Sequence, residues 1–204
     1  MRLIRFLLPL VLVLGIDGAV HALPITLTLD PSSVVLTAGQ TLTVDVIVDG
    51  LEDDGEIALE SFDLDLSFDN TRLSFDSLSF GTSLGDPNNG AETFLTGPGN
   101  PNVNSVVEMG EFSFLSEAAL LALQSAPFVL ATIEFTALEN PGVALLEFIN
   151  LSGSSLGGLG GAALGDDLAT PSALNVTIVP EPAAAVLLLS ALGLLARRGR
   201  GTRS

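Results

Sequence analysis

The sequence predicts an all-β fold, a β-sandwich of roughly nine strands with one short helix. In residues 41–48 and 61–68, every second side chain is apolar, and most of those between are Thr, Ser or Asp. A period of two places one set of side chains in a core and the other set in solvent. Seven less regular runs are separated by Gly, Pro and Asn, which is typical of a sandwich.

The other elements are predicted in order along the chain. A helix begins after Ser116, which can cap its first turn, and ends before Pro127; we expect it to close one end of the sandwich. Residues 97–102 are expected to form a mobile connector, and residues 153–165, six of them Gly, a flexible loop. The seven weaker runs predict strands at residues 25–30, 33–37, 73–80, 106–115, 128–137, 143–149 and 173–178.

The body of the chain, residues 23–178, is long enough to form a single domain without disulfides. Residues 23–181 contain 23 Asp and Glu against one Arg, and the formal net charge of the whole chain is −17. This charge argues against nucleic-acid binding, which needs a basic surface.

Most catalytic side chains are absent from the same stretch. Residues 23–181 have no Cys, Lys, His, Tyr or Trp. Thiolate, Schiff-base and Ser/His nucleophiles are therefore excluded, and only carboxylate chemistry is left. We expect a protein that is not an enzyme and has no cofactor, with calcium as the one ion to consider.

The first 22 residues have the three regions of a secretory signal peptide. Arg2 and Arg5 precede the apolar run 6–16, and Val20 and Ala22 occupy the −3 and −1 positions of a cleavage site. We therefore expect export through the inner membrane and a mature chain that starts at Leu23.

The C-terminal end carries a second, more specific signal. Pro180, Glu181 and Pro182 disfavour regular structure and are followed by the apolar residues 183–196. Fourteen residues make a helix of about 21 Å, shorter than the roughly 30 Å hydrocarbon core of a bilayer, so this helix is expected to be a temporary membrane stop. By the positive-inside rule, the arginines after it stay cytoplasmic: Arg197, Arg198, Arg200 and Arg203.

This tail, residues 179–204, resembles a PEP-CTERM sorting signal. The resemblance implies recognition by an exosortase-type processing enzyme at the inner membrane, transient membrane insertion, and removal of the tail near the Pro-Glu-Pro motif. It also implies that the body is released or attached at the cell surface, the outer envelope or the extracellular matrix of a Gram-negative bacterium. A permanent single-pass anchor is the alternative.

The body itself resembles a cohesin-type domain. The similarity lies in TAGQTLTVDV (37–46), LESFDLDLSFDNTRLSF (59–75) and LATIEFTA (130–137). Cohesins and related carbohydrate-binding modules are nine-stranded jelly-roll sandwiches. The resemblance implies an adhesion or protein-binding module, with an envelope protein as partner. Binding of exopolysaccharide is the alternative, although the body lacks the Tyr and Trp rings on which sugars often stack.

Two observations would decide between these functions. An exposed cluster of Phe on one sheet face would favour a carbohydrate-binding module. Two carboxylates converging in a deep pocket would favour the remote alternative, a glycoside hydrolase, for which Asp63 and Asp65 lie about 7 Å apart on one strand face.

Other acidic groups are candidates for calcium or for structural pairing. Side-chain oxygens of Asp86, Asn88 and Glu92 alternate in one loop, although the loop does not fit the full calcium-binding pattern. Arg72, the single base of the body, is expected to form an ion pair with Asp69 or a neighbouring acid. Paired carboxylates also occur at residues 53–56 and 166–167.

Overall fold

The computed structural model describes residues 24–51, 57–125 and 127–181. The predicted signal peptide and the tail from Pro182 onward lie outside these ranges. None of the helices in the described ranges has the length and hydrophobicity needed to cross a bilayer. The strands are β1 (Thr26–Pro31), β2 (Val35–Thr37), β3 (Thr41–Asp49), β4 (Leu59–Phe68), β5 (Leu73–Phe80), β6 (Thr93–Thr96), β7 (Val106–Ser113), β8 (Phe128–Ala137), β9 (Gly142–Ile149), β10 (Leu156–Gly158), β11 (Ala162–Ala163) and β12 (Leu174–Val179).

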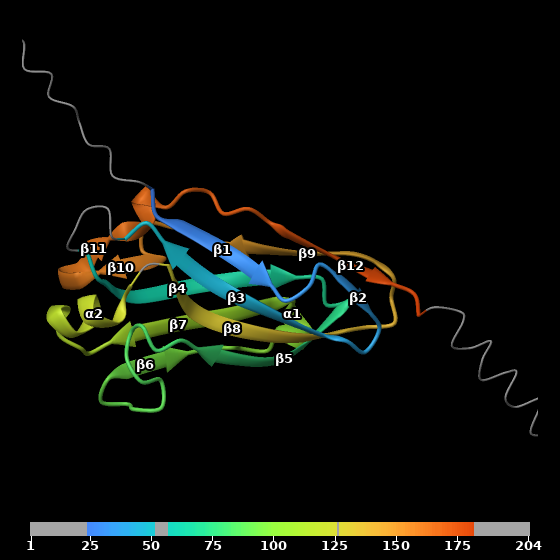
Figure 1. Cartoon of the computed structure of the whole chain (residues 1–204), viewed down its shortest axis with the longest axis horizontal. Coiled ribbons are helices and arrows are strands. Elements are labelled where there is room, and N and C mark those ends of the chain that lie inside the picture. Colours follow the sequence, from blue (N-terminus) through green and yellow to red (C-terminus); the bar gives the residue numbers. More distant parts are fainter. Residues whose placement is uncertain (1–23, 52–56, 126, 182–204) are drawn as a thin grey trace, which may run out of the picture.

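Two sheets face each other, which confirms the predicted all-β sandwich (Figure 1). The smaller sheet has the order β1-β3-β8-β5, with every pair antiparallel. In the larger sheet, β7 and then β6 lie on one side of β4. The other edge of β4 is shared by β10 and β9, and β9 continues the sheet to β12 and β2.

The alternating runs form the core as predicted. In β3, Leu42, Val44, Val46 and Val48 are fully buried, while the residues between them reach the outer face. On β4, Leu64, Leu66 and Phe68 are buried in the same way. The ring centroids of Phe68 and Phe135, one from each sheet, are 5.0 Å apart, so the sheets meet through apolar contact.

The nine predicted strands are all present, and three short strands were not predicted: β6, β10 and β11. The prediction of a flexible loop at residues 153–165 is wrong. This segment forms β10, β11 and two 3₁₀ turns (Leu159–Gly161 and Leu164–Asp167), and β10 pairs with β4. Its glycines allow close approach, because a Cβ at Gly157 would lie 2.4 Å from Ser61 Oγ and one at Gly165 would lie 2.3 Å from the Ser152 carbonyl oxygen.

The prediction of a mobile connector at residues 97–102 is also wrong. The segment leads into the short helix α1 (Pro101–Asn104). Asn102 fixes it, because its Oδ1 accepts a hydrogen bond from the Phe75 backbone N–H at 2.8 Å and its Nδ2 donates to the Phe75 carbonyl at 2.9 Å. The side-chain amide of Asn102 thus satisfies the backbone N–H and C=O of Phe75, as a neighbouring strand would.

The predicted helix is α2 (Glu117–Leu123), and it follows Ser116 as expected, although the Ser116 side chain makes no capping hydrogen bond. Leu120 is fully buried. Gln124, just after the helix, accepts a hydrogen bond from the Leu59 N–H at 2.8 Å and donates to the Leu59 carbonyl at 2.6 Å. These buried hydrogen bonds join α2 to the start of β4.

The last strand, β12, ends one residue later than the strand predicted at residues 173–178. Val179 pairs with Thr37 of β2, so the sandwich extends one residue past Ile178. Pro180 and Glu181 follow directly and line a hollow of about 320 Å³ with Ala38, Leu138 and other residues at this end of the molecule.

We predict that Gln124→Ala destabilises the protein by about 2 kcal/mol, because the buried Leu59 N–H and C=O lose their partners. Urea denaturation measures the effect. Leu121→Ala, at an exposed position of the same helix, is the control and should change stability by less than about 1 kcal/mol. Equal effects of the two substitutions would contradict this role of Gln124.

Candidate binding face

The outer face of β6 and β7 carries an exposed cluster of three phenylalanines, here called the aromatic cluster: Phe94, Phe112 and Phe114. Their side chains are 59%, 40% and 57% exposed. Phe94 lies directly opposite Phe112 in the antiparallel pair, and the rings of Phe112 and Phe114 meet edge to face with centroids 5.4 Å apart. Grouped aromatic rings in solvent mark an interaction surface more often than scattered apolar residues do.

A polar hollow of about 190 Å³ lies on the same outer face, beside the aromatic cluster. Asp63 and Asp65 of β4 form one wall, and the chain after β9 forms the other. Asn150 has a left-handed backbone conformation (φ 56°) and donates from Nδ2 to Asp65 Oδ2 at 3.0 Å. The remaining lining residues are Ile149, Ser152, Ser154 and Ser155.

Small polar groups fill the row between the aromatic cluster and the hollow. Across β7 and β4, Phe112 lies opposite Ser61, and Gly110 lies opposite Asp63. A Cβ at Gly110 would lie 2.4 Å from Thr96 Oγ1 and 3.5 Å from Asp63 Oδ1. The rings and the two carboxylates therefore share one continuous surface, which we call the binding face.

The two hydrolase candidates, Asp63 and Asp65, lie on one strand face, as their spacing predicts, and the structure also places both in one hollow. Both carboxylates project from the same strand onto an outer sheet face. A glycosidase needs two carboxyl groups on opposite sides of the scissile bond. The observed placement suits ligand binding better than bond cleavage.

The calcium candidates Asp86, Asn88 and Glu92 lie together in the loop before β6. Asp86 Oδ1 accepts a hydrogen bond from the Asn88 N–H at 2.9 Å, and Glu92 Oε2 accepts one from the Asp86 N–H at 3.0 Å. Glu92 Oε1 also accepts from Asn89 Nδ2. Within the described ranges, no group of three or more His, Cys, Asp or Glu is placed to hold a metal.

Arg72 forms the predicted ion pair with Asp69. Burial opposes ionisation of Asp69, but hydrogen bonds from the Thr71 hydroxyl, Arg72 and the Thr71 N–H outweigh it and lower the pKa of this carboxyl. Arg72 therefore helps to fix the turn between β4 and β5.

Sequence reasoning missed Glu111, a carboxyl buried on the inner face of β7 and only 3% exposed. It lies between Phe62 of β4 and Leu95 of β6, and no described residue forms a hydrogen bond with its Oε1. Burial raises the pKa of Glu111 to about 7. The alternation in VVEMGEFS, which places Glu111 in phase with Val107 and Met109, was the available signal.

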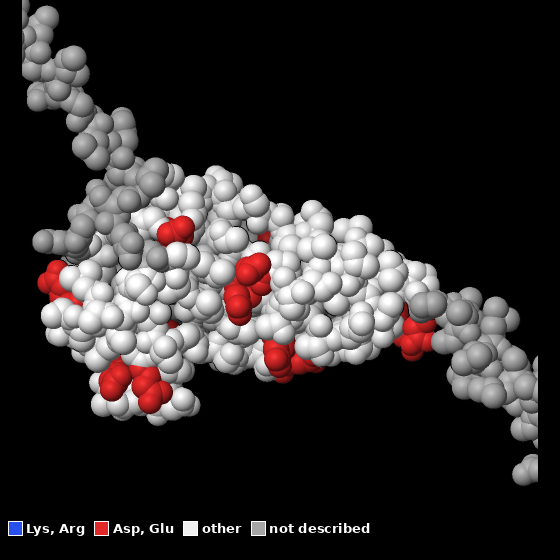
Figure 2. All heavy atoms as spheres, in the orientation of Figure 1, with Lys and Arg blue, Asp and Glu red and all other residues white. Residues whose placement is uncertain are grey.

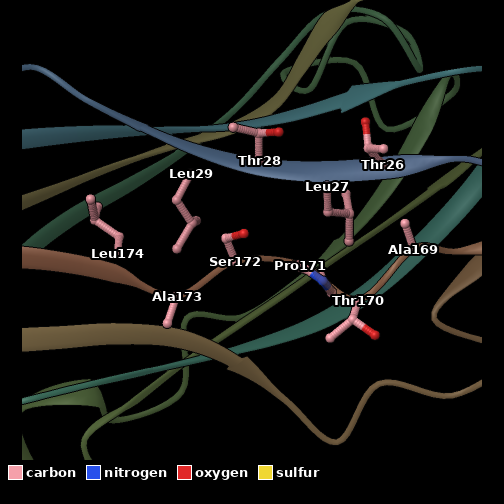
Figure 3. Close-up of a pocket in the computed structure, with 10 residues that line it drawn as sticks. All are labelled: Thr26, Leu27, Thr28, Leu29, Ala169, Thr170, Pro171, Ser172, Ala173 and Leu174. Carbon is pink, nitrogen blue, oxygen red and sulfur yellow. The ribbon is translucent and has the colours of Figure 1, made fainter.

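A further hollow of about 270 Å³ lies in the seam between β1 and residues 169–174. Figure 3 shows Leu27 and Leu29 pointing into this seam, while Thr26 and Thr28 point away from it. None of the residues that line it is ionisable. It therefore offers no group for acid or base catalysis.

The remaining site predictions concern acidic residues on the surface and residues that the structure does not describe. On the face of the molecule shown in Figure 2, the visible acidic side chains form separate small groups, and no described Lys or Arg is visible there. Asp166 packs against the backbone of Gly153. Val20, Ala22, residues 53–56, Pro182, Arg197, Arg198 and Arg200 lie outside the described residues.

The fold of the body is a cohesin-like β-sandwich. A type II cohesin domain from the cellulosome of Acetivibrio cellulolyticus is similar, with a TM-score of 0.58 and 11% identity over 75% of this chain and 95% of that one. A cohesin module of a Clostridium perfringens family 33 glycoside hydrolase has a TM-score of 0.55 and 13% identity, over 78% and 98%.

A chain of a type I cohesin–dockerin complex from Clostridium thermocellum has a TM-score of 0.56 and 13% sequence identity, over 76% of this chain and 99% of that one. At such identities the likeness establishes the fold alone. No protein-family model and no curated protein sequence matches the chain.

We predict that Glu111→Gln raises stability relative to the natural chain at high pH but has little effect near pH 5. The folded state holds the proton more tightly, so stability is lost as pH rises from the ordinary pKa of 4.5 toward about 7 and stays lower above it. The gain at pH 8.5 should be of the order of 2 kcal/mol, measured by urea denaturation at both pH values. Glu108→Gln, on the exposed face of the same strand, should show no such dependence. A pH-independent difference for Glu111→Gln would contradict the buried-acid interpretation.

Calcium at residues 86–92 stays a prediction with a direct test. Added NaCl should raise the melting temperature, because screening weakens repulsion among the acidic groups, and calcium should raise it further. The Asp86→Asn variant should lose only the additional calcium effect. If calcium adds nothing beyond sodium at matched ionic strength, specific coordination is excluded.

Proposed function

We propose that this protein is an exported, non-catalytic surface protein whose sandwich is an adhesion or protein-binding module. The observation that carries the proposal is the aromatic cluster on the outer face of β6 and β7. Well-ordered strands hold these rings in place, so little conformational entropy is lost when a partner covers them. The missing nucleophiles and the single-strand placement of Asp63 and Asp65 support a role without catalysis.

Two classes of partner are candidates for the binding face. Neighbours with this fold are described in complexes with dockerins, which supports an envelope protein as partner. An exposed cluster of Phe on one sheet face favours a carbohydrate-binding module, so exopolysaccharide is the second candidate. In both cases the ligand meets the outer face of β6, β7 and β4.

The two ends of the chain provide export and sorting in this proposal. Residues 1–22 direct export, and the segment that begins at Pro180 acts as a removable PEP-CTERM-type signal read by an exosortase-type enzyme. The end of β12 at Val179 supports this division, because the last ladder pair is completed before the Pro-Glu-Pro motif begins. The body then reaches the cell surface, outer envelope or extracellular matrix.

We predict that Phe94→Ser combined with Phe112→Ser abolishes retention of envelope material by the purified full chain while leaving its stability nearly unchanged. Both rings lie on the outer face of the sheet, with Phe94 59% and Phe112 40% exposed, so their loss removes partner contacts and few core contacts. Pull-down from envelope protein and polysaccharide fractions measures retention. Val103→Ser, at a position 75% exposed on α1, is the matched control. Undiminished retention by the double variant would exclude this face as the binding surface.

We predict that deletion of residues 180–204 leaves the sandwich folded and sends it to the periplasm or medium unsorted. The deletion removes no strand residue, since β12 ends at Val179. Replacing Pro180, Glu181 and Pro182 by Ala should instead leave an uncut, membrane-held precursor. Mass spectrometry of surface material tests both, and recovery of the intact C-terminal peptide there would show a permanent anchor.

A further inference from the structure

We infer that the polar hollow on the binding face holds one sugar unit of a neutral polysaccharide, and that the aromatic cluster supports the next part of the same chain. This inference rests on the proposed function, because it takes the outer face of β6, β7 and β4 as the binding surface. Of the two candidate partners, an envelope protein and an exopolysaccharide, it selects the polysaccharide.

The hollow has more hydrogen-bond acceptors than donors. No described side chain or backbone N–H donates to the Asp63 carboxylate, and Asp65 accepts only from Asn150 among the described residues. The hydroxyls of Ser152 and Ser154 already bond to each other at 3.0 Å. A ligand rich in hydroxyl donors would satisfy these acceptors, and sugars supply closely spaced hydroxyls.

The charge of the hollow selects among polysaccharides. Asp63 and Asp65 are acidic, and the one basic side chain in the described residues, Arg72, is engaged with Asp69. A uronic or sulfated polymer would therefore meet like charges with no cation to offset them. Neutral sugars avoid this repulsion.

The geometry suits a chain longer than one sugar. Phe112 and Gly110 are two positions apart on β7, which places the ring about 7 Å along the strand from the row that contains Asp63. Between the ring and the hollow the face carries only small polar groups, namely Ser61 opposite Phe112 and the Thr96 hydroxyl over Gly110. An apolar ring face beside a few convergent polar groups is the usual composition of a small-ligand site.

The test is retention of the full chain, purified in mild detergent, on immobilised dextran, starch and mannan, with alginate as the acidic polymer. We expect retention on at least one neutral polymer and none on alginate. Asp63→Ala and Phe112→Ser should each weaken it about tenfold. Asp30→Ala, at an exposed strand position of the other sheet, and Val103→Ser should leave it unchanged, and urea denaturation confirms that all variants are folded.

Three other results would contradict the inference, and the first of them would leave the proposed function intact. If no neutral polymer is retained but the phenylalanine double variant still loses an envelope protein, the inference is wrong and the proposed function stands. Retention that Asp63→Ala leaves intact also overturns the inference. If retention requires calcium and is abolished by EDTA, the hollow is a cation site and not a sugar site.

Discussion

Apolar contact between two sheets is the interaction on which this structure depends. The chain has no Cys, and its described residues contain one ion pair, Arg72 with Asp69. Disulfides and ion-pair networks therefore contribute little, and the inner rows of Leu, Val and Phe must supply the stability. This explains why the strict alternation in β3 and β4 coincides with full burial. It also leaves the outer rows free to vary, and the binding face is one such set of rows.

Three of the acidic residues are accommodated by local donors in place of distant cations. Asp69, Asp86 and Glu92 accept hydrogen bonds from groups a few residues away. Such bonds stabilise ionised carboxylates without any Lys. Glu111 differs from these three residues, since it is in phase with the apolar positions of β7 and lies inside. Because Glu111 is buried, the stability of the edge formed by β6 and β7, which carries the aromatic cluster, is expected to depend on pH.

Sequence reasoning recovered the elements whose signal is local. The bounds of β5 and β8 match the predicted ranges 73–80 and 128–137, because each run is rich in apolar residues and is bounded by local turn and breaker residues. It failed at residues 153–165, where glycine composition indicates flexibility but the absent side chains permit close backbone pairing with β4. The polar hollow could not be predicted either. Asp65 and Asn150 are 85 positions apart, and only the pairing of β4 with β9 brings them together.

The position of β12 determines how the molecule bears a mechanical load. β12 lies between β9, with which it pairs antiparallel, and β2, with which it pairs parallel. Tension applied beyond Val179 along the strand axis would shear both ladders at once, so many hydrogen bonds share the load and must break together. The same sheet carries the load onward through β9 to β4 and the binding face. A ligand pulled away from that face would thus be resisted along a single hydrogen-bonded sheet, with no need for force to pass through the apolar contact between sheets.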